Sequence, residues 1–437
     1  MSNKIIKRSY LVVEWNQKTP LCVSSGDNKY ADNDVMRDFD GHPFIPGSSV
    51  AGALRNYLND DKKVFGYSEG EKGNMSPVYV SDFYYDEPDK KQFKVRDQIR
   101  VDKYKIAEDG AKFDMEVVEP ENDENAVSGK LYFEIEQFQE NATDVLETLK
   151  KGIAGIHKGD IRFGLKKNRG YGEFRVLNVY EKTFDMNNEE QKKAWLSFDV
   201  REYYKTGENI TKSCLAMTDE KYESFITLKI PLKLKGGISI REYHAKKNEP
   251  DFAHITSAGH AVIPGTSWNG AIRHQCEAIL EELQAAGNIR TSMIDEMFGK
   301  VVVEKGQDKT AKQSSVVIGE SRLKGLTDEK PIFLTMTRNK IDRFDASTEK
   351  GALYTEKAVF SAQTELVIKV RKQEQWKWQV GMLLLVIQDI QQGYLPIGGQ
   401  TAIGRGIFET NGEISISQEI DQEMCIKEIV KRMKKEA

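Results

Sequence analysis

Hydrophobic and polar residues alternate in two stretches that lie far apart in the chain. Ser9–Trp15 (SYLVVEW) and Phe225–Leu234 (FITLKIPLKL) both follow the two-residue period of a β-strand. After each stretch a polar loop ends in Ile-Pro-Gly, and the next residues have the spacing of a helix. A residue before proline avoids the helical conformation, so we expect each helix to begin beyond the proline, with Ser49 or Ser267 as its N-cap.

The same order of elements continues in both halves. Further strand patterns precede a second helical stretch, and a glycine-rich loop and a last strand close each half. The order strand, helix, strands, helix, strand is that of a ferredoxin-like domain, so the sequence predicts the α+β class. We expect these strands at Val78–Tyr85, Lys130–Phe138, Ser315–Leu323 and Glu365–Val370, and the second helices at Thr143–Ile153 and Gln375–Gly393.

The two halves also share sequence, which indicates an internal duplication. Phe44–Leu58 (FIPGSSVAGALRNYL) and Val262–Cys276 (VIPGTSWNGAIRHQC) agree at Ile-Pro-Gly, at the second serine, and at the glycine, alanine and arginine of the helix. Further segments match in the same order: Val64–Gly66 with Met297–Gly299, Ser76–Phe83 with Ser314–Ser321, Arg100–Tyr104 with Lys340–Phe344, Gly110–Val118 with Gly351–Val359, and Phe163–Phe174 with Ile397–Phe408.

The duplication predicts two domains, 1–185 and 221–437. Residues 186–220 are polar and poorly periodic and match neither copy, which suits an interdomain connection. The second domain ends in an amphipathic stretch, Ile420–Ala437, which we expect to form a helix that packs on its own domain.

Ala31–Arg55 (ADNDVMRDFDGHPFIPGSSVAGALR) resembles the N-terminal signature of the RAMP superfamily. More narrowly, it resembles the backbone subunits of type III CRISPR interference complexes, with Asp-x-x-Val-x-Arg-Asp, then Ile-Pro-Gly-Ser-Ser, then Gly-x-x-Arg. The Phe65-Gly66 pair, the run Arg100–Val118 and the loop Gly164–Gly172 are also similar to that family. Between them, the two copies bring nearly the whole chain under the resemblance.

The resemblance implies two tandem ferredoxin-like (RRM-like) domains with inserted thumb hairpins, at Arg100–Val118 and Lys340–Val359. It also implies a subunit that lies along a CRISPR guide RNA and meets a target single-stranded RNA. The widely spaced cysteines fit reduced thiols, so we expect a cytoplasmic protein. Its protein partners would be the other effector subunits, namely a large polymerase-like subunit and other backbone subunits.

In type III backbones an aspartate beside each thumb cuts the target RNA with a divalent metal, and the resemblance places that residue at Asp32. A carboxylate in a loop can hold Mg²⁺ or Mn²⁺ while the RNA phosphate supplies other ligands. Asp34 stands where the family has a small residue or proline, so we expect the metal role to be shared with Asp34 or shifted to it. The alternative is a solvated acidic turn, since Asp38 and Asp40 follow closely.

The second copy departs from the first in this loop. Counting back from its Ile-Pro-Gly puts Pro250 opposite Asp32, with Asp251 one residue along, and Ile255-Thr256 replaces Arg37-Asp38. We therefore expect the second copy to bind RNA without cutting it, unless a one-residue shift of the loop lets Asp251 act as a second catalytic residue.

Candidate RNA-binding residues lie at matching places in the two copies. The helix arginines, Arg55 and Arg273, could hold phosphates through their planar forks or could be ordinary surface residues. Backbone amides at the helix start and the glycine-rich loops could approach phosphates closely, with one aromatic side chain to stack on a base; a tight hairpin is the alternative for the loops. These candidates are Ser48, Ser49, Lys166, Lys167, Arg169, Tyr171 and Arg405.

Composition narrows the classes of function. The 437 residues carry a net charge of -4, so RNA binding must rest on local basic loops rather than on a global field. The four cysteines form no CxxC pair, which argues against a zinc site or a disulfide framework. The longest apolar stretch, Val380–Ile387, is too short to span a membrane, and the N-terminus lacks the apolar core of a signal peptide.

Two alternatives to a nuclease subunit stay open. The first is a structural RNA-binding backbone subunit that does not cut. The second is a guide-processing endonuclease of the same superfamily, but such enzymes use a histidine near the N-terminus and none precedes His42. His42 and His260 recur in both copies, and we interpret them as structural loop residues.

Overall fold

The computed structural model describes residues 4–26, 29–70, 72–102, 106–138, 144–217, 222, 225–243, 249–301, 311–327 and 330–435. The chain divides into two compact units. The first comprises Met1–Lys167 and Tyr171–Ser224, and the second comprises Asn168–Gly170 and Phe225–Ala437. No helix of the described ranges is long and apolar enough to cross a membrane.

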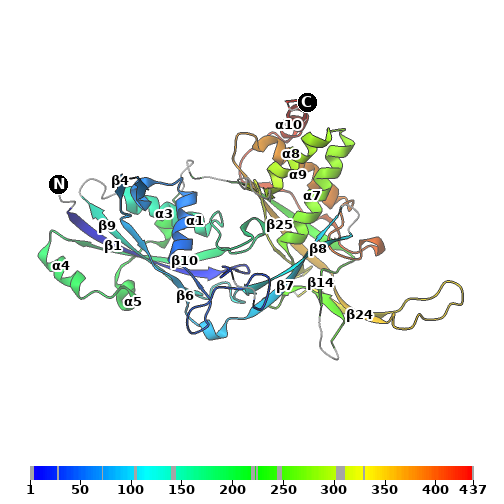
Figure 1. Ribbon diagram of the computed structural model, residues 1–437, viewed down its shortest axis with the longest axis horizontal. Coiled ribbons are helices and arrows are strands. Elements are labelled where there is room, and N and C mark those ends of the chain that lie inside the picture. Colours follow the sequence, from blue (N-terminus) through cyan, green and yellow to red (C-terminus); the bar gives the residue numbers. More distant parts are fainter. Residues whose placement is uncertain are drawn as a thin grey trace. The chain divides into compact units, whose positions relative to one another are not determined.

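The first unit is built on an antiparallel sheet with its longest strand, β1 (Ile5–Gln17), in the middle. β1 pairs with β10 (Phe174–Asp185) on one side and with β9 (Gly129–Phe138) on the other. Two helices, α1 (Gly47–Tyr57) and α3 (Asp144–His157), cover one face of this sheet (Figure 1). Apart from the strands of an inserted hairpin, the other elements up to β10 are β2 (Phe44–Ile45), α2 (Lys62–Phe65), β3 (Tyr67–Glu69), β4 (Lys72–Asn74), β5 (Val78–Val80), β6 (Phe83–Tyr85), η1 (Pro88–Lys90) and η2 (Lys167–Arg169).

The second unit repeats this plan. β12 (Phe225–Lys235) lies between β25 (Ala362–Arg371) and β26 (Ile407–Thr410), and β20 (Val316–Ile318) extends the sheet beyond β25. Its helices are α7 (Gly265–Glu282), α8 (Gly287–Phe298), α9 (Trp376–Gln391), η4 (Thr401–Ile403) and α10 (Gln422–Lys435). Its shorter strands are β13 (Gly237–Ile238), β14 (Arg241–Tyr243), β15 (Phe252–His254), β16 (Thr256–Ser257), β17 (His260–Ile263), β18 (Lys300–Val301), β19 (Ala311–Lys312), β21 (Ser321–Arg322), β22 (Lys324–Gly325) and β27 (Ser415–Ile416).

In both units the strands lie in the spatial order fourth, first, third, second, and the helices follow the first and third strands. This is the ferredoxin-like arrangement. The prediction of an α+β chain with two tandem ferredoxin-like domains is therefore confirmed.

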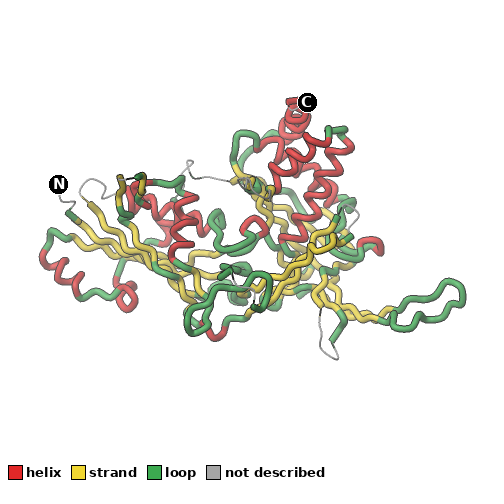
Figure 2. The backbone as a smooth tube through the Cα atoms, viewed as in Figure 1, coloured by secondary structure: helices red, strands yellow, loops and turns green. Residues whose placement is uncertain are grey.

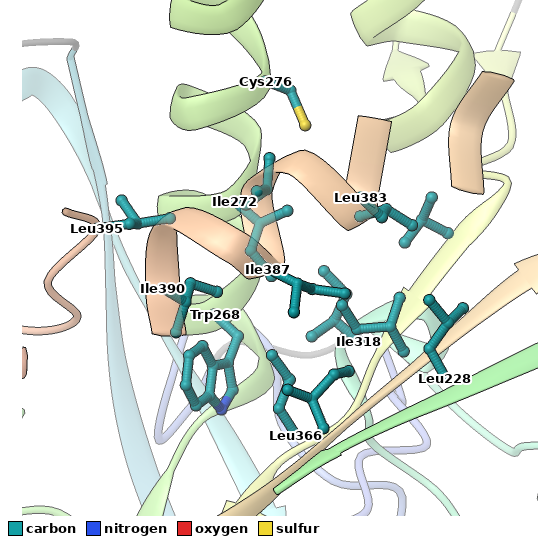
Figure 3. Close-up of a cluster of buried hydrophobic side chains, with 14 of the residues drawn as sticks. Leu228, Trp268, Ile272, Cys276, Ile318, Leu366, Leu383, Ile387, Ile390 and Leu395 are labelled. Atoms are coloured by element: carbon teal, nitrogen blue, oxygen red, sulfur yellow. The ribbon is translucent and has the colours of Figure 1, made fainter. Parts of the chain in front are cut away.

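The core of the second unit shows how the periodic residues are used (Figure 3). Trp268 and Ile272 of α7 meet Ile387 of α9 above the sheet residues Leu228 and Leu366, and all five are fully or almost fully buried. The apolar run of α9 is thus covered by protein on several sides, which is why it is hydrophobic all round.

The helix after each Ile-Pro-Gly begins earlier than expected. The N-caps are Pro46 and Pro264, without a side-chain capping hydrogen bond, so the expectation that Ser49 and Ser267 cap these helices is wrong. The close contacts of Gly47 and Gly265 explain why each Ile-Pro-Gly motif ends in glycine. A Cβ on Gly47 would lie 2.5 Å from the Val80 carbonyl oxygen, and one on Gly265 would lie 2.4 Å from that of Ile318. Only glycine lets the helix start rest directly on the neighbouring strand.

A two-stranded hairpin is inserted in each unit, as the resemblance implied. The first consists of β7 (Phe93–Val101) and β8 (Ala107–Val118), and the second of β23 (Ile332–Arg338) and β24 (Tyr354–Phe360). The first hairpin begins before Arg100, and its residues 103–105 lie outside the described ranges. In Figure 2 the second hairpin continues as a long loop beyond its paired strands.

The stretch expected as a connection is folded on the first unit over its described part, which ends at residue 217. It contains α4 (Glu189–Leu196), α5 (Val200–Tyr203), η3 (Tyr204–Thr206), β11 (Glu208–Asn209), which pairs with β10, and α6 (Thr211–Leu215). Trp195 Nε1 donates to Tyr10 Oη at 2.8 Å, and Tyr204 Oη donates to Glu14 Oε1 at 2.7 Å. Tyr10 and Glu14 alternate with the core residues of β1, so this covering segment (189–206) lies over the sheet face opposite the helices.

We predict that Tyr204→Phe destabilises the first unit by about 1–3 kcal/mol, because it leaves the buried Glu14 carboxylate without one of its donors. Denaturant unfolding of the full chain measures this change. Tyr203→Phe is the matched control, since Tyr203 is 48% exposed. An equal loss of stability in the two variants would contradict a stabilising role for the hydrogen bond from Tyr204 to Glu14.

Candidate functional site

Asp32 lies beside the second strand of the first hairpin and is joined to it by two reciprocal hydrogen bonds. The Asp114 N–H donates to Asp32 Oδ2 at 2.9 Å, and the Asp32 N–H donates to Asp114 Oδ1 at 2.8 Å. One residue further on, the Glu116 N–H donates to the Asn33 carbonyl at 3.0 Å. The Asp32 side chain is exposed, and its Oδ1 accepts no hydrogen bond from the described residues. The loop therefore presents one carboxylate oxygen to solvent.

Asp34 has a different role from the one expected. Its side chain is buried, and its two oxygens accept hydrogen bonds from the backbone N–H groups of Lys29, Tyr30 and Ala31 at 2.6–3.1 Å. Burial alone would raise the pKa of Asp34, but these N–H groups and the charge of Arg37 together lower it. Its oxygens are committed to shaping the loop, so the geometry argues against the expected share in metal binding.

An ion pair fixes the same loop to the hairpin from the other side. The Arg37 guanidinium donates to both oxygens of Glu116, at 2.7 and 2.9 Å, and the Val35 N–H donates to Glu116 Oε2 at 3.0 Å. The guanidinium also lies over the Phe93 ring, 4.2 Å from its centre. A bidentate pair with a buried carboxylate has a fixed geometry, so it sets how the loop leaves the hairpin.

The turn that follows holds the one group of three potential metal ligands found in the described ranges. One ligand atom each of Asp38, Asp40 and His42 lies within 4.8 Å of the others. Asp38 Oδ1 also accepts from the N–H groups of Asp40 and His42, and His42 Nε2 lies 3.0 Å from Asp89 Oδ1. This agrees with a structural turn, but its Asp-x-Asp-x-His spacing could have been noticed in the sequence as a possible set of ligands.

In the second copy the structure places Asp251, and not Pro250, at the position of Asp32. The Thr355 N–H donates to Asp251 Oδ2 at 2.6 Å, as the Asp114 N–H donates to Asp32. Thr355 and Asp114 occupy the same place in the repeated hairpin segment, and β15 runs parallel to β24 just after Asp251. Counting back from Ile-Pro-Gly was wrong by one residue, because the two loops differ in length before that motif.

His254 anchors the strand that follows Asp251. Its Nε2–H donates to the Val262 carbonyl at 2.9 Å, and its Nδ1 accepts from the Ile240 N–H at 3.2 Å. The ring must be neutral for Nδ1 to accept this second bond. Burial lowers the pKa of His254 to about 4.

The predicted RNA-binding residues of the helices lie at the surface. Ser48 and Ser49 are exposed in the first turn of α1. Arg55 forms an exposed ion pair with Asp60, and Arg273 Nε lies 3.3 Å from Glu277 Oε1. Exposed pairs of this kind are weak, so both arginines can exchange their partner for a phosphate.

Several side chains of the glycine-rich loops pack against the protein and are not open to RNA. Lys166 bonds to Gln98 of the first hairpin and lies 4.1 Å from the centre of the Phe113 ring, whereas Lys167 is exposed. Tyr171 is 3% exposed within the core, so its ring is closed to base stacking. Arg405 is 7% exposed and lies 3.7 Å from the buried Glu356, which closes it to phosphate. For these two residues the geometry does not support the expected RNA contact.

Arg169 is the exception in the first loop. Residues Asn168–Gly170 group with the second unit, and there the Arg169 guanidinium lies near that of Arg273. Its Nη1 is buried and has no hydrogen-bond partner among the described residues. Burial and the positive charge of Arg273 lower the pKa of Arg169 to about 10. Two neighbouring cations with an unused donor favour a phosphate ligand.

Comparison with known families supports the repeat. A family model described as the RAMP superfamily matches residues 18–175 and again residues 247–409. None of the curated proteins matches the chain. The matched ranges include both hairpins and both acidic loops.

We predict that acid destabilises the second unit through His254. A histidine in an unfolded chain has a pKa of about 6.5, whereas that of folded His254 is about 4. The unfolded state therefore binds more protons between these values, so this contribution is complete above about pH 6.5 and is lost as the pH falls through about 4, by about 3 kcal/mol in all. Urea unfolding at several pH values measures the slope.

His254→Gln should lower stability at neutral pH and flatten that slope. His260→Gln, on the neighbouring strand β17, should keep the slope of the unmodified chain. If His254→Gln retains the full slope, another group causes the acid sensitivity.

Proposed function

Because this chain belongs to the RAMP superfamily, with one matched region in each half, we propose that it is a guide-RNA-binding backbone subunit of a type III CRISPR interference complex that cuts complementary target RNA. At the coarser level of the family, it is a CRISPR-associated RNA-binding subunit. The proposed partners are a guide RNA, a target single-stranded RNA, a large polymerase-like subunit and other backbone subunits.

The observation that carries the proposal is the matched placement of Asp32 and Asp251. Each is an exposed loop carboxylate that accepts a hydrogen bond from the backbone N–H at the equivalent position of its own inserted hairpin. An exposed acid beside a hairpin is of little use to a protein that only holds RNA, because a carboxylate repels phosphates. Its repetition in both copies therefore supports a role in cutting.

The hairpins themselves suit contact with an RNA duplex. In the first, Ile99 and Ile106 are 55% and 63% exposed, and beyond the strands of the second, Phe344 is fully exposed. Apolar side chains that stand out into water are costly unless something covers them. Nucleic-acid bases are apolar on their faces, so these side chains can lie against bases that have left their stack.

Asp32 fits a divalent cation as a single ligand. Its free Oδ1 is the hard oxygen donor that Mg²⁺ or Mn²⁺ prefers, and such ions bind through one or two carboxylates together with substrate phosphates. When bound, the cation would offset the charge that develops on the scissile phosphate. The attacking group would be the neighbouring 2′-hydroxyl, which loses its proton to water as its oxygen bonds to phosphorus. The bond to the 5′-oxygen breaks, that oxygen takes a proton from water, and the products are a 2′,3′-cyclic phosphate and a 5′-hydroxyl. Asp32 would orient that phosphate beside the hairpin.

The second candidate function is a backbone subunit that holds RNA without cutting it. The supports of Asp251 differ from those of Asp32, because Thr355 and Lys357 stand where the first copy has Asp114 and Glu116. This difference favours a first copy that cuts and a second copy that cuts more slowly or not at all.

We predict that Asp32→Ala in the guide-loaded complex removes one target-RNA cut, and that Asp251→Ala removes a second cut if the second copy is active. The expected loss is at least about 100-fold in the single-turnover rate with Mg²⁺, because the substitution removes a ligand of the cation that would offset the charge on the reacting phosphate. Target binding, measured separately without a divalent ion, should change by less than about twofold.

Asp40→Ala is the control that tests the neighbouring turn. Asp40 is exposed and belongs to the Asp38, Asp40 and His42 group. Loss of the cut with Asp40→Ala but not with Asp32→Ala would move the metal to the turn. Survival of every cut in the Asp32→Ala, Asp251→Ala double variant would favour the structural subunit.

We also predict that Arg169→Ala weakens guide-RNA binding by about tenfold and reduces the slope of log K against log salt by about 1, as expected for one lost phosphate contact. Binding of a guide RNA at several salt concentrations measures both. Arg175→Ala, an exposed residue of β10, is the charge-matched control and should leave the slope unchanged. Equal slopes for all three proteins would contradict a phosphate contact at Arg169.

A further inference from the structure

The two candidate sites differ in how the loop is held. In the first copy the hydrogen bonds form a closed pair, because Asp32 and Asp114 each bind the backbone N–H of the other through a carboxylate oxygen. In the second copy Asp251 accepts from the Thr355 N–H, but Thr355 has no carboxylate to return the bond. The Thr355 hydroxyl instead lies 3.1 Å from that of Thr337, across the second hairpin.

The closed pair fixes both the backbone and the side chain of Asp32. A carboxylate that accepts one hydrogen bond can turn about that bond, whereas two bonds in opposite directions define both its position and its orientation. Asp32 is exposed, and the hydrogen bond that its side chain accepts from the described residues comes from the Asp114 N–H, so this pair aims the remaining Oδ1. Ordering a loop carboxylate before the substrate arrives removes an entropic cost from the reaction.

We propose that Asp114 is a positioning residue for the Asp32 carboxylate, and that it makes the first copy the faster of two cutting sites. The inference rests on the proposed function, in which Asp32 holds a divalent cation at the scissile phosphate. Asp114 acts through Asp32, since its own Oδ1 is taken by the Asp32 N–H. A residue with this role should need its hydrogen-bonding oxygen and not its charge.

The chain offers variants that separate these properties. Asp114→Asn keeps an acceptor oxygen and loses the charge, whereas Asp114→Ala loses both. Asp97 lies opposite Asp114 in the hairpin and pairs with Lys112 at 3.4 Å, so Asp97→Ala removes a nearby negative charge without touching the pair.

The experiment uses the guide-loaded complex and measures the single-turnover rate of the first cut over a Mg²⁺ titration. Asp114→Ala should lower the rate at saturating Mg²⁺ by about 10- to 100-fold, as a misplaced catalytic group does, with target binding within about twofold. Asp114→Asn should stay within about threefold of the unmodified chain, and so should Asp97→Ala. Hydrogen exchange of the full chain should speed up over residues 29–36 in Asp114→Ala but not over 249–254 in Thr355→Ala.

Three results would overturn the inference. If Asp114→Ala cuts at the normal rate while Asp32→Ala is inactive, the pair does not position the carboxylate. If Asp114→Asn is as slow as Asp114→Ala, the charge of Asp114 matters and it acts as a ligand. If Asp32→Ala itself cuts normally, the proposed function fails and this inference fails with it.

Discussion

A backbone N–H on the second strand of an inserted hairpin, donated to a loop carboxylate, is the contact on which both candidate sites depend. It joins Asp114 to Asp32 at 2.9 Å and Thr355 to Asp251 at 2.6 Å. Every residue except proline provides this donor, so the side chain at the position can change after duplication without loss of the contact. The hairpin therefore places the acid, and the ferredoxin-like sheet places the hairpin.

The surroundings of the shared contact have diverged, and they show two ways to hold one loop. The first copy uses charged groups, with Arg37 paired to the buried Glu116 and Asp114 returning the bond to Asp32. The second copy uses the buried neutral ring of His254, which bridges Ile240 and Val262. A neutral buried anchor avoids the desolvation cost of an ion pair, but it makes the second loop sensitive to acid.

The fold was predictable because its signals are local and repeated. Strand periods, Ile-Pro-Gly and the closing glycines occur twice in the same order, so the element order predicted for one half is supported by the other half. The site was less predictable because burial decides which loop residues are available. Tyr171 lies in the same glycine-rich run as the exposed Lys167, and Arg405 lies in the matching run of the second copy, yet both Tyr171 and Arg405 are buried. The place of Asp251 needed the pairing of β15 with β24, since a one-residue difference in loop length does not show in the repeat.

The ferredoxin-like scaffold does not by itself say where RNA binds. RNA-recognition domains on this scaffold stack bases on the open face of the sheet. In the first unit that face is covered by residues 189–206, which bond to Tyr10 and Glu14 of the central strand. Bases cannot reach β1 without displacing this segment and leaving the Glu14 carboxylate with fewer donors. The covering segment therefore leaves the loops and the hairpin as the open surface of the first unit, and these carry the exposed acid, the exposed lysine and the exposed apolar side chains.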